Sequence, residues 1–151
     1  MDAFADSNSI SKNRLWGGRI LSGLTVAFMI FDGVIHVLQP PPVVQGFAAL
    51  GFPLSVAVPL GIIELIFVVL YVIPRTSVFG AILLTGYLGG AIASQVRIAA
   101  PFFSTILFPI YVAVFMWGGL YLRDRRVCAL IPFRNQVTRD SEGLARESGL
   151  N

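Results

Sequence analysis

Residues 20–38 read ILSGLTVAFMIFDGVIHVL, an apolar run that contains two ionisable side chains, Asp32 and His36. A helix needs about 20 apolar residues to cross the hydrocarbon core of a bilayer, and this run is close to that length. Ionisable side chains are costly inside a membrane, so they are kept there for a structural or functional reason. The run therefore predicts a membrane helix that carries a polar site.

Three further apolar runs follow, at residues 56–73, 78–98 and 102–122. The chain of 151 residues is 56% hydrophobic and 13% charged, which is about half the charged share of a soluble domain. Together the runs predict an all-α fold, a transmembrane four-helix bundle over residues 14–134. Residues 1–13 and 135–151 are polar and lack apolar periodicity, so we expect a mobile N-terminal segment and a disordered tail.

Ten of the eleven basic residues lie on one side of the predicted bundle. They are Lys12, Arg14, Arg19, Arg75, Arg123, Arg125, Arg126, Arg134, Arg139 and Arg146. The positive-inside rule assigns this side to the cytoplasm, so we expect a multi-pass protein of the inner membrane with both termini cytoplasmic. The loop at residues 39–55 has no basic residue and is predicted outside, with a short surface helix at residues 43–50. The net charge of +3 then reflects topology and contact with the lipid bilayer, and no folded basic surface for nucleic acid is evident.

The later spans add three polar side chains to Asp32 and His36. Glu64 lies near the middle of the second span, and Gln95 and Arg97 lie towards the outer end of the third. Asp32 and His36 are four residues apart and share one helix face, where a carboxylate favours the charged imidazole. Arg97 could pair with either acid. We expect these five residues to form a buried polar pocket.

Four interpretations of that pocket remain open. The polar groups could only fix the register of the helices, or they could face a quinone or another lipophilic small molecule as hydrogen-bond or proton-transfer partners. They could also line a proton or solute path. A metal site made of His36 and the two acids is not expected, because nothing in the sequence shows that two helices converge there. The residue types alone assign no catalytic role.

Small and special residues add three expectations. Gly86, Gly90 and Ser94 repeat at four-residue spacing, which predicts close packing against another helix, with a ligand groove as the alternative. Pro109 is predicted to kink the fourth helix. Cys128 is the only cysteine, which excludes an internal disulfide or a CxxC dithiol centre.

Several motifs run along the whole predicted bundle. They read GFP at residues 51–53, GIIEL at 61–65, TGYLGGA at 85–91, PFF at 101–103 and WGGLYLRD at 117–124. Over about residues 15–134, this pattern resembles the DoxX-like family of small four-helix membrane proteins. Glu64 matches the acid in the second span of that family.

The resemblance implies a redox role, because the family is named for a subunit of an archaeal thiosulfate:quinone oxidoreductase. We therefore expect an accessory or quinone-linked subunit of a membrane redox system, with a membrane or cytoplasmic oxidoreductase as its partner. Two alternatives belong to other classes. One is a stand-alone membrane enzyme that acts on a lipophilic substrate with His36 and a carboxylate as acid and base. The other is a small solute or proton transporter, for which four spans would require a homodimer.

Overall fold

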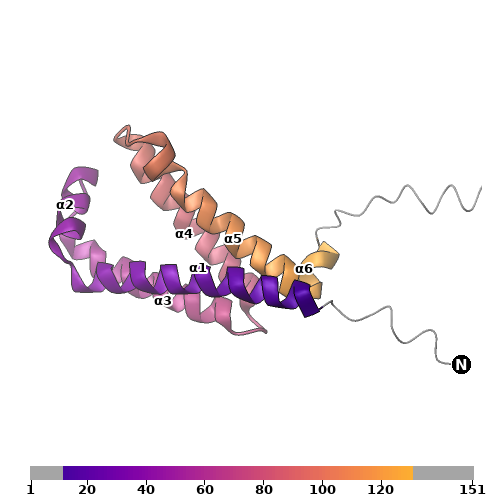
Figure 1. The fold of residues 1–151 in the computed structure, drawn as a ribbon. Helices are drawn as coiled ribbons and strands as arrows, with labels where there is room; N and C mark the ends of the chain where they lie inside the picture. The colour runs from indigo at the N-terminus through magenta and orange to yellow at the C-terminus, as the bar shows by residue number, and fades with distance from the viewer. Residues whose placement is uncertain (1–11, 131–151) are drawn as a thin grey trace, which may run out of the picture.

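The structure is a computed structural model that describes residues 12–130, and within them every regular element is helical. The predicted terminal segments at residues 1–13 and 135–151 lie almost wholly outside the described residues. Figure 1 shows the arrangement of the elements. In chain order they are α1 (Lys12–Leu38), α2 (Pro41–Leu50), η1 (Leu54–Val56), α3 (Ala57–Val72), α4 (Ser77–Arg97), η2 (Phe102–Ile106), α5 (Phe108–Arg123) and α6 (Arg125–Leu130).

Four helical segments are long and apolar enough to cross a membrane, as the hydrophobic runs predicted. They are Lys12–Leu38, Leu54–Val72, Ser77–Arg97 and Phe102–Arg123. The first begins ahead of its apolar run, because α1 continues through the basic stretch around Arg14 and Arg19. Most of their large apolar side chains face outward, as expected for a protein whose solvent is lipid.

The four long helices pack in a closed ring: α1 contacts α3 and α5, and α4 contacts α3 and α5. The described ends of the chain, α6 and the start of α1, lie together at one end of the bundle, and α2 lies at the other (Figure 1). Towards the α2 end, the α1–α3 pair diverges from the α4–α5 pair (Figure 1). This divergence determines where side chains can line an internal space.

Glycine pairs hold α1 tightly against both of its neighbours. A Cβ atom at Gly61 of α3 would lie 2.6 Å from the Gly33 carbonyl oxygen of α1. A Cβ atom at Gly119 of α5 would lie 2.6 Å from Ser22 Oγ, and one at Gly18 would lie 2.9 Å from the Gly119 carbonyl oxygen. Backbones can approach this closely only where no side chain intervenes. Close packing in this bundle therefore depends on these glycines.

A buried tyrosine links three helices at the end of the bundle that carries α6 and the start of α1. Tyr71 is 0% exposed, and its hydroxyl lies 3.0 Å from Ser22 Oγ of α1 and 2.9 Å from the Met116 carbonyl oxygen of α5. Arg123 donates a hydrogen bond to the Tyr71 carbonyl oxygen and lies 4.9 Å from the centre of its ring. These contacts join α1, α3 and α5 where the bundle is narrow.

Two proline-containing segments lie towards the opposite end. The loop helix begins at Pro41, earlier than predicted, because proline is accommodated in a first helical turn that leaves its N–H positions unpaired. Pro109, predicted to kink the fourth helix, likewise lies in the first turn of a helix, α5. The π-helical turn η2 comes shortly before it in the same span, and a kink at Pro109 itself stays a prediction.

Candidate functional site

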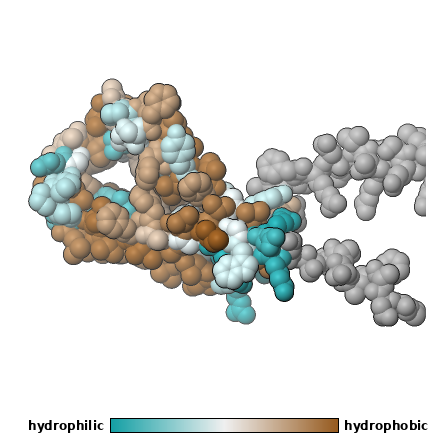
Figure 2. All heavy atoms as spheres, viewed as in Figure 1, coloured by the Kyte–Doolittle hydropathy of each residue, from teal (hydrophilic) through white to brown (hydrophobic). Residues whose placement is uncertain are grey.

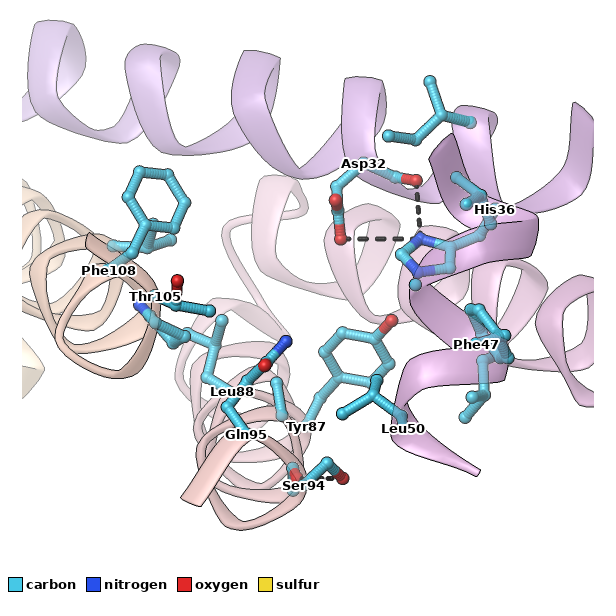
Figure 3. A pocket seen from close by; sticks show the side chains of 18 of the residues that line it. Asp32, His36, Phe47, Leu50, Tyr87, Leu88, Ser94, Gln95, Thr105 and Phe108 are labelled. Carbon is cyan, nitrogen blue, oxygen red and sulfur yellow. Dashed lines mark hydrogen bonds and ion pairs between the residues drawn. The ribbon is translucent and has the colours of Figure 1, made fainter. Parts of the chain in front are cut away.

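Asp32 and His36 form the first part of a polar cluster on α1. His36 Nδ1 lies 2.8 Å from the Asp32 carbonyl oxygen and 3.5 Å from the carboxylate oxygen Oδ2 of the same residue. A carbonyl oxygen can only accept, so Nδ1 carries the hydrogen in this contact. The ring lies beside Asp32 and faces the space in front of Tyr87 (Figure 3). Phe47 of α2 packs against it, with ring centroids 5.6 Å apart.

Glu64 of α3 completes the cluster behind His36. The Glu64 side chain is 0% exposed, and its oxygen Oε2 lies 4.0 Å from His36 Nδ1. The Tyr87 hydroxyl of α4 donates a hydrogen bond to the same oxygen at 2.9 Å. The second carboxyl oxygen, Oε1, has no hydrogen-bond partner among residues 12–130. A fully buried carboxyl group with one unpaired oxygen is energetically expensive.

The close approach of α1 and α3 brings the acids together. Gly61 lies one helical turn before Glu64, and a Cβ atom there would be 2.9 Å from His36 Cβ. The Gly33–Gly61 contact thus places ligand-type atoms of Asp32, His36 and Glu64 within 4.8 Å of one another. One imidazole nitrogen and two carboxylate oxygens at this spacing are a set that could hold a metal ion. In the observed rotamer, however, His36 Nδ1 presents a hydrogen towards the carboxyl groups, which favours hydrogen bonding over metal ligation.

A cavity of about 880 Å³ lies in front of this cluster. Its wall is formed by α1, α2, η1, the start of α3, α4, η2 and the start of α5, and it is mostly apolar, with residues such as Phe28, Leu60 and Phe108. The polar residues that line it are Asp32, His36, Tyr87, Ser94, Gln95, Ser104 and Thr105. Figure 2 shows a hollow surrounded largely by hydrophobic atoms at the end that carries α2. The volume falls within the range of small-molecule sites, which are also lined mainly by apolar side chains.

A family model described as "DoxX-like family" matches residues 20–119 of this chain. The chain belongs to the DoxX-like family. It is therefore a multi-pass membrane protein with four helices long and apolar enough to span the bilayer. No curated protein matches the chain, and no solved structure matches it. Asp32, His36, Glu64 and Tyr87 all lie inside the matched range.

The five polar residues expected at one site occupy three different environments in this DoxX-like protein. Asp32, His36 and Gln95 line the cavity, and Glu64 lies directly behind the first two. Arg97 lies elsewhere: it donates a hydrogen bond to the Leu50 carbonyl oxygen and stacks over Phe52, 5.4 Å from the ring centre. The Phe47 and Ala48 carbonyl groups of α2 are already capped by the backbone N–H groups of Phe52 and Gly51, and Arg97 caps that of Leu50, at a helix end where a cation is favoured. The alternative in which Arg97 pairs with Asp32 or Glu64 is not realised.

Close packing of the small-residue stripe is a wrong prediction, and its alternative, a groove, describes the geometry. Gly86, Gly90 and Ser94 all line the cavity. A Cβ atom built at Gly86 or Gly90 meets no atom within 4 Å, whereas one at Gly61 collides with backbone. The spacing identified a smooth helix face correctly. It could not show whether another helix or an open space lies opposite, because that depends on the divergence of the two helix pairs.

Sequence reasoning missed Tyr87 and the π-helical turn. Tyr87 lies within the TGYLGGA motif, where its neighbouring glycines drew attention instead. Its spacing of three residues from Gly90 on α4 was the available signal, since residues three or four apart share a helix face. Ser104 and Thr105 reach the cavity from η2, where i→i+5 hydrogen bonds such as Ile106 N to the Pro101 carbonyl oxygen replace the α-helical pattern. Nothing in the local sequence specifies that turn.

Proposed function

We propose that this DoxX-like protein binds a quinone-class lipophile in its cavity and acts as an accessory or quinone-linked subunit of a membrane redox system. The observation that carries the proposal is a large apolar cavity with one compact polar cluster, Asp32–His36–Tyr87, on its wall. A quinone combines an apolar chain with a small ring that exchanges protons. The cavity offers surfaces of both kinds. Cys128 is the only thiol of the chain, so a partner oxidoreductase in the membrane or cytoplasm would exchange the electrons.

Binding of decylubiquinone to the purified protein tests this proposal. Gly90→Leu should abolish binding, because the new side chain enters open space inside the cavity and occupies the volume of the ligand. Stability should change by less than about 0.5 kcal/mol, as no contact is overpacked. Gly89→Leu is the matched control. Gly89 is the adjacent residue of α4, also meets no atom within 4 Å and is not part of the cavity wall.

The measurement is isothermal titration calorimetry in detergent, compared across wild type, Gly90→Leu and Gly89→Leu. We expect saturable heat for wild type and Gly89→Leu, and only micelle partition for Gly90→Leu. Equal heats from all three proteins would contradict a quinone site in this cavity.

A second candidate function is supported by the orientation of His36. Its Nδ1 hydrogen is held by the Asp32 carbonyl oxygen, so Nε2 is the nitrogen available as a base at the cavity. A membrane enzyme that transfers a proton to or from a lipophilic substrate would use His36 in this way. Tyr87 lines the same cavity and would lie close to that substrate. The two candidates differ in one respect: the enzyme would transform its substrate without a partner protein, whereas the redox subunit would not.

We further propose that both termini face the cytoplasm of an inner-membrane protein and that the cavity lies in the outer half of the membrane. The basic residues of α1 and α6 gather at the end opposite α2, which supports this orientation. In a Cys128→Ser background, a cysteine at the exposed position Gln45 should react with an impermeant maleimide in intact cells. A cysteine at the exposed position Asn13 should react only after permeabilisation. The reverse pattern would invert the topology.

A further inference from the structure

We infer that the polar corner of the cavity, defined by Asp32, His36 and Tyr87, selects lipophiles that donate a hydrogen bond, namely phenolic compounds such as a quinol. The inference rests on the proposed function, because it specifies which chemical form of a lipophilic ring the cavity prefers. It follows from counting the hydrogens that each group of the corner has already used. A ligand can only complement what the protein leaves unpaired.

His36 has no hydrogen left for a ligand in its neutral form. Its Nδ1–H is directed to the Asp32 carbonyl oxygen at 2.8 Å, with the Asp32 carboxylate at 3.5 Å and the Glu64 carboxyl at 4.0 Å on the same edge of the ring. Nε2 then carries a lone pair that can accept a hydrogen bond, and this nitrogen has no partner among residues 12–130. The ring faces the cavity with that side (Figure 3). It can accept a hydrogen bond from a ligand.

Tyr87 also has no hydrogen left to donate to a ligand. Its only hydroxyl hydrogen is donated to Glu64 Oε2 at 2.9 Å, so the oxygen offers lone pairs to the cavity. Ser94, one step along the same wall, likewise donates its hydrogen to the Gly90 carbonyl oxygen at 2.9 Å. In its ionised form, the Asp32 carboxylate has acceptor oxygens only. All four groups therefore present acceptors to whatever enters the cavity.

The charge of the wall narrows the choice of ligand further. Within the described part of the chain, no Lys or Arg lines the cavity, and Asp32 is its one acidic member. A carboxylate or phosphate ligand would meet acceptors and a negative charge without a compensating cation, which costs the desolvation of both groups. A phenolic hydroxyl instead supplies the missing hydrogen. Gln95 carries both a donor and an acceptor, so it can serve a second oxygen on the ring of such a ligand.

A pair of redox-inert probes tests the inference: p-decylphenol and its methyl ether, p-decylanisole. Methylation keeps the ring, the chain and the oxygen but removes the hydrogen. We expect the phenol to bind at least about tenfold more tightly, the consequence of leaving buried acceptors unpaired in the ether complex. Binding is measured by calorimetry on the full chain in detergent. Heats from the same titrations into protein-free detergent are subtracted as micelle partition.

Asp32→Asn tests whether the polar corner causes the preference for the phenol, because it replaces an acceptor oxygen by a nearly isosteric amide donor. The phenol-to-anisole ratio should fall severalfold in this variant and stay at the wild-type value in Gly89→Leu. Equal affinities for the two probes in wild type, tighter binding of the ether, or an unchanged ratio in Asp32→Asn would overturn the inference. If decylubiquinone binds and the ether binds as tightly as the phenol, the proposed quinone site survives without this selectivity. If neither those two nor the phenol binds, the proposed function itself fails.

Discussion

Gly61→Leu is expected to destabilise the bundle by about 3 kcal/mol or more, the upper range for overpacking a well-packed interface. Even the first added carbon would lie 2.6 Å from the Gly33 carbonyl oxygen and 2.9 Å from His36 Cβ. Neither atom can rotate away, since one belongs to backbone and the other to the root of a side chain. Helices α1 and α3 must separate, and Glu64 must then move away from His36. The same change should therefore abolish ligand binding in the protein that still folds.

Chemical unfolding in bicelles measures this effect, with Gly23→Leu as the matched control. Gly23 also belongs to α1, is exposed and meets no atom within 4 Å, so the same substitution should leave the unfolding free energy nearly unchanged. Gly61→Ala should be intermediate, because it adds the clashing Cβ atom alone. Equal midpoints for Gly61→Leu and Gly23→Leu would mean that α1 and α3 do not touch at Gly33 and Gly61.

Removal of the buried carboxyl group should have the second largest effect. We expect Glu64→Ala to reduce the free energy of unfolding by about 3 kcal/mol, from two causes. The Tyr87 hydroxyl loses its acceptor while it remains partly buried, and a cavity opens where the side chain was fully enclosed. Glu64→Gln keeps the volume and an acceptor oxygen, so its stability should equal or exceed that of wild type, because a neutral group is cheaper to bury.

A double-mutant cycle separates the two causes. Tyr87→Phe removes the donor, so the combination Glu64→Ala/Tyr87→Phe should cost less than the sum of the single variants by about 1 kcal/mol. Unfolding midpoints in bicelles provide all four values. Strict additivity would show that the 2.9 Å contact between the Tyr87 hydroxyl and Glu64 contributes nothing to folding. Glu64→Gln also tests function. A variant that folds normally but no longer retains decylubiquinone would show that the charge of the Glu64 carboxylate is needed for binding.

Much of the fold could be predicted from the sequence because it depends on local properties. The lengths and hydrophobicity of four runs predicted four long helices, and the structure has them at nearly the same residues. The spacing of Asp32 and His36 placed both on one face of one helix, since neighbours at i and i+4 are set by helix geometry alone. These features need no knowledge of what packs against the helix.

The composition of the site depended on contacts between helices, which local pattern does not encode. Glu64 reaches His36 because Gly33 and Gly61 let α1 and α3 approach, and Tyr87 reaches Glu64 from a third helix. Arg97 shares the C-terminal end of α4 with Gln95, yet it donates its hydrogen bond to the Leu50 carbonyl oxygen at the end of α2 and not to either acid.

The glycine stripe of α4 shows the same division between local and tertiary information. Its periodicity determined that Gly86, Gly90 and Ser94 share one helix face. Gly61 likewise leaves the surface of α3 without a side chain at its position. Only the tertiary structure decided that one face meets a cavity and the other a helix backbone. The physical reason is that a helix specifies the direction of its side chains through its own hydrogen bonds. The distance to the next helix is instead a compromise among all the side chains packed along both.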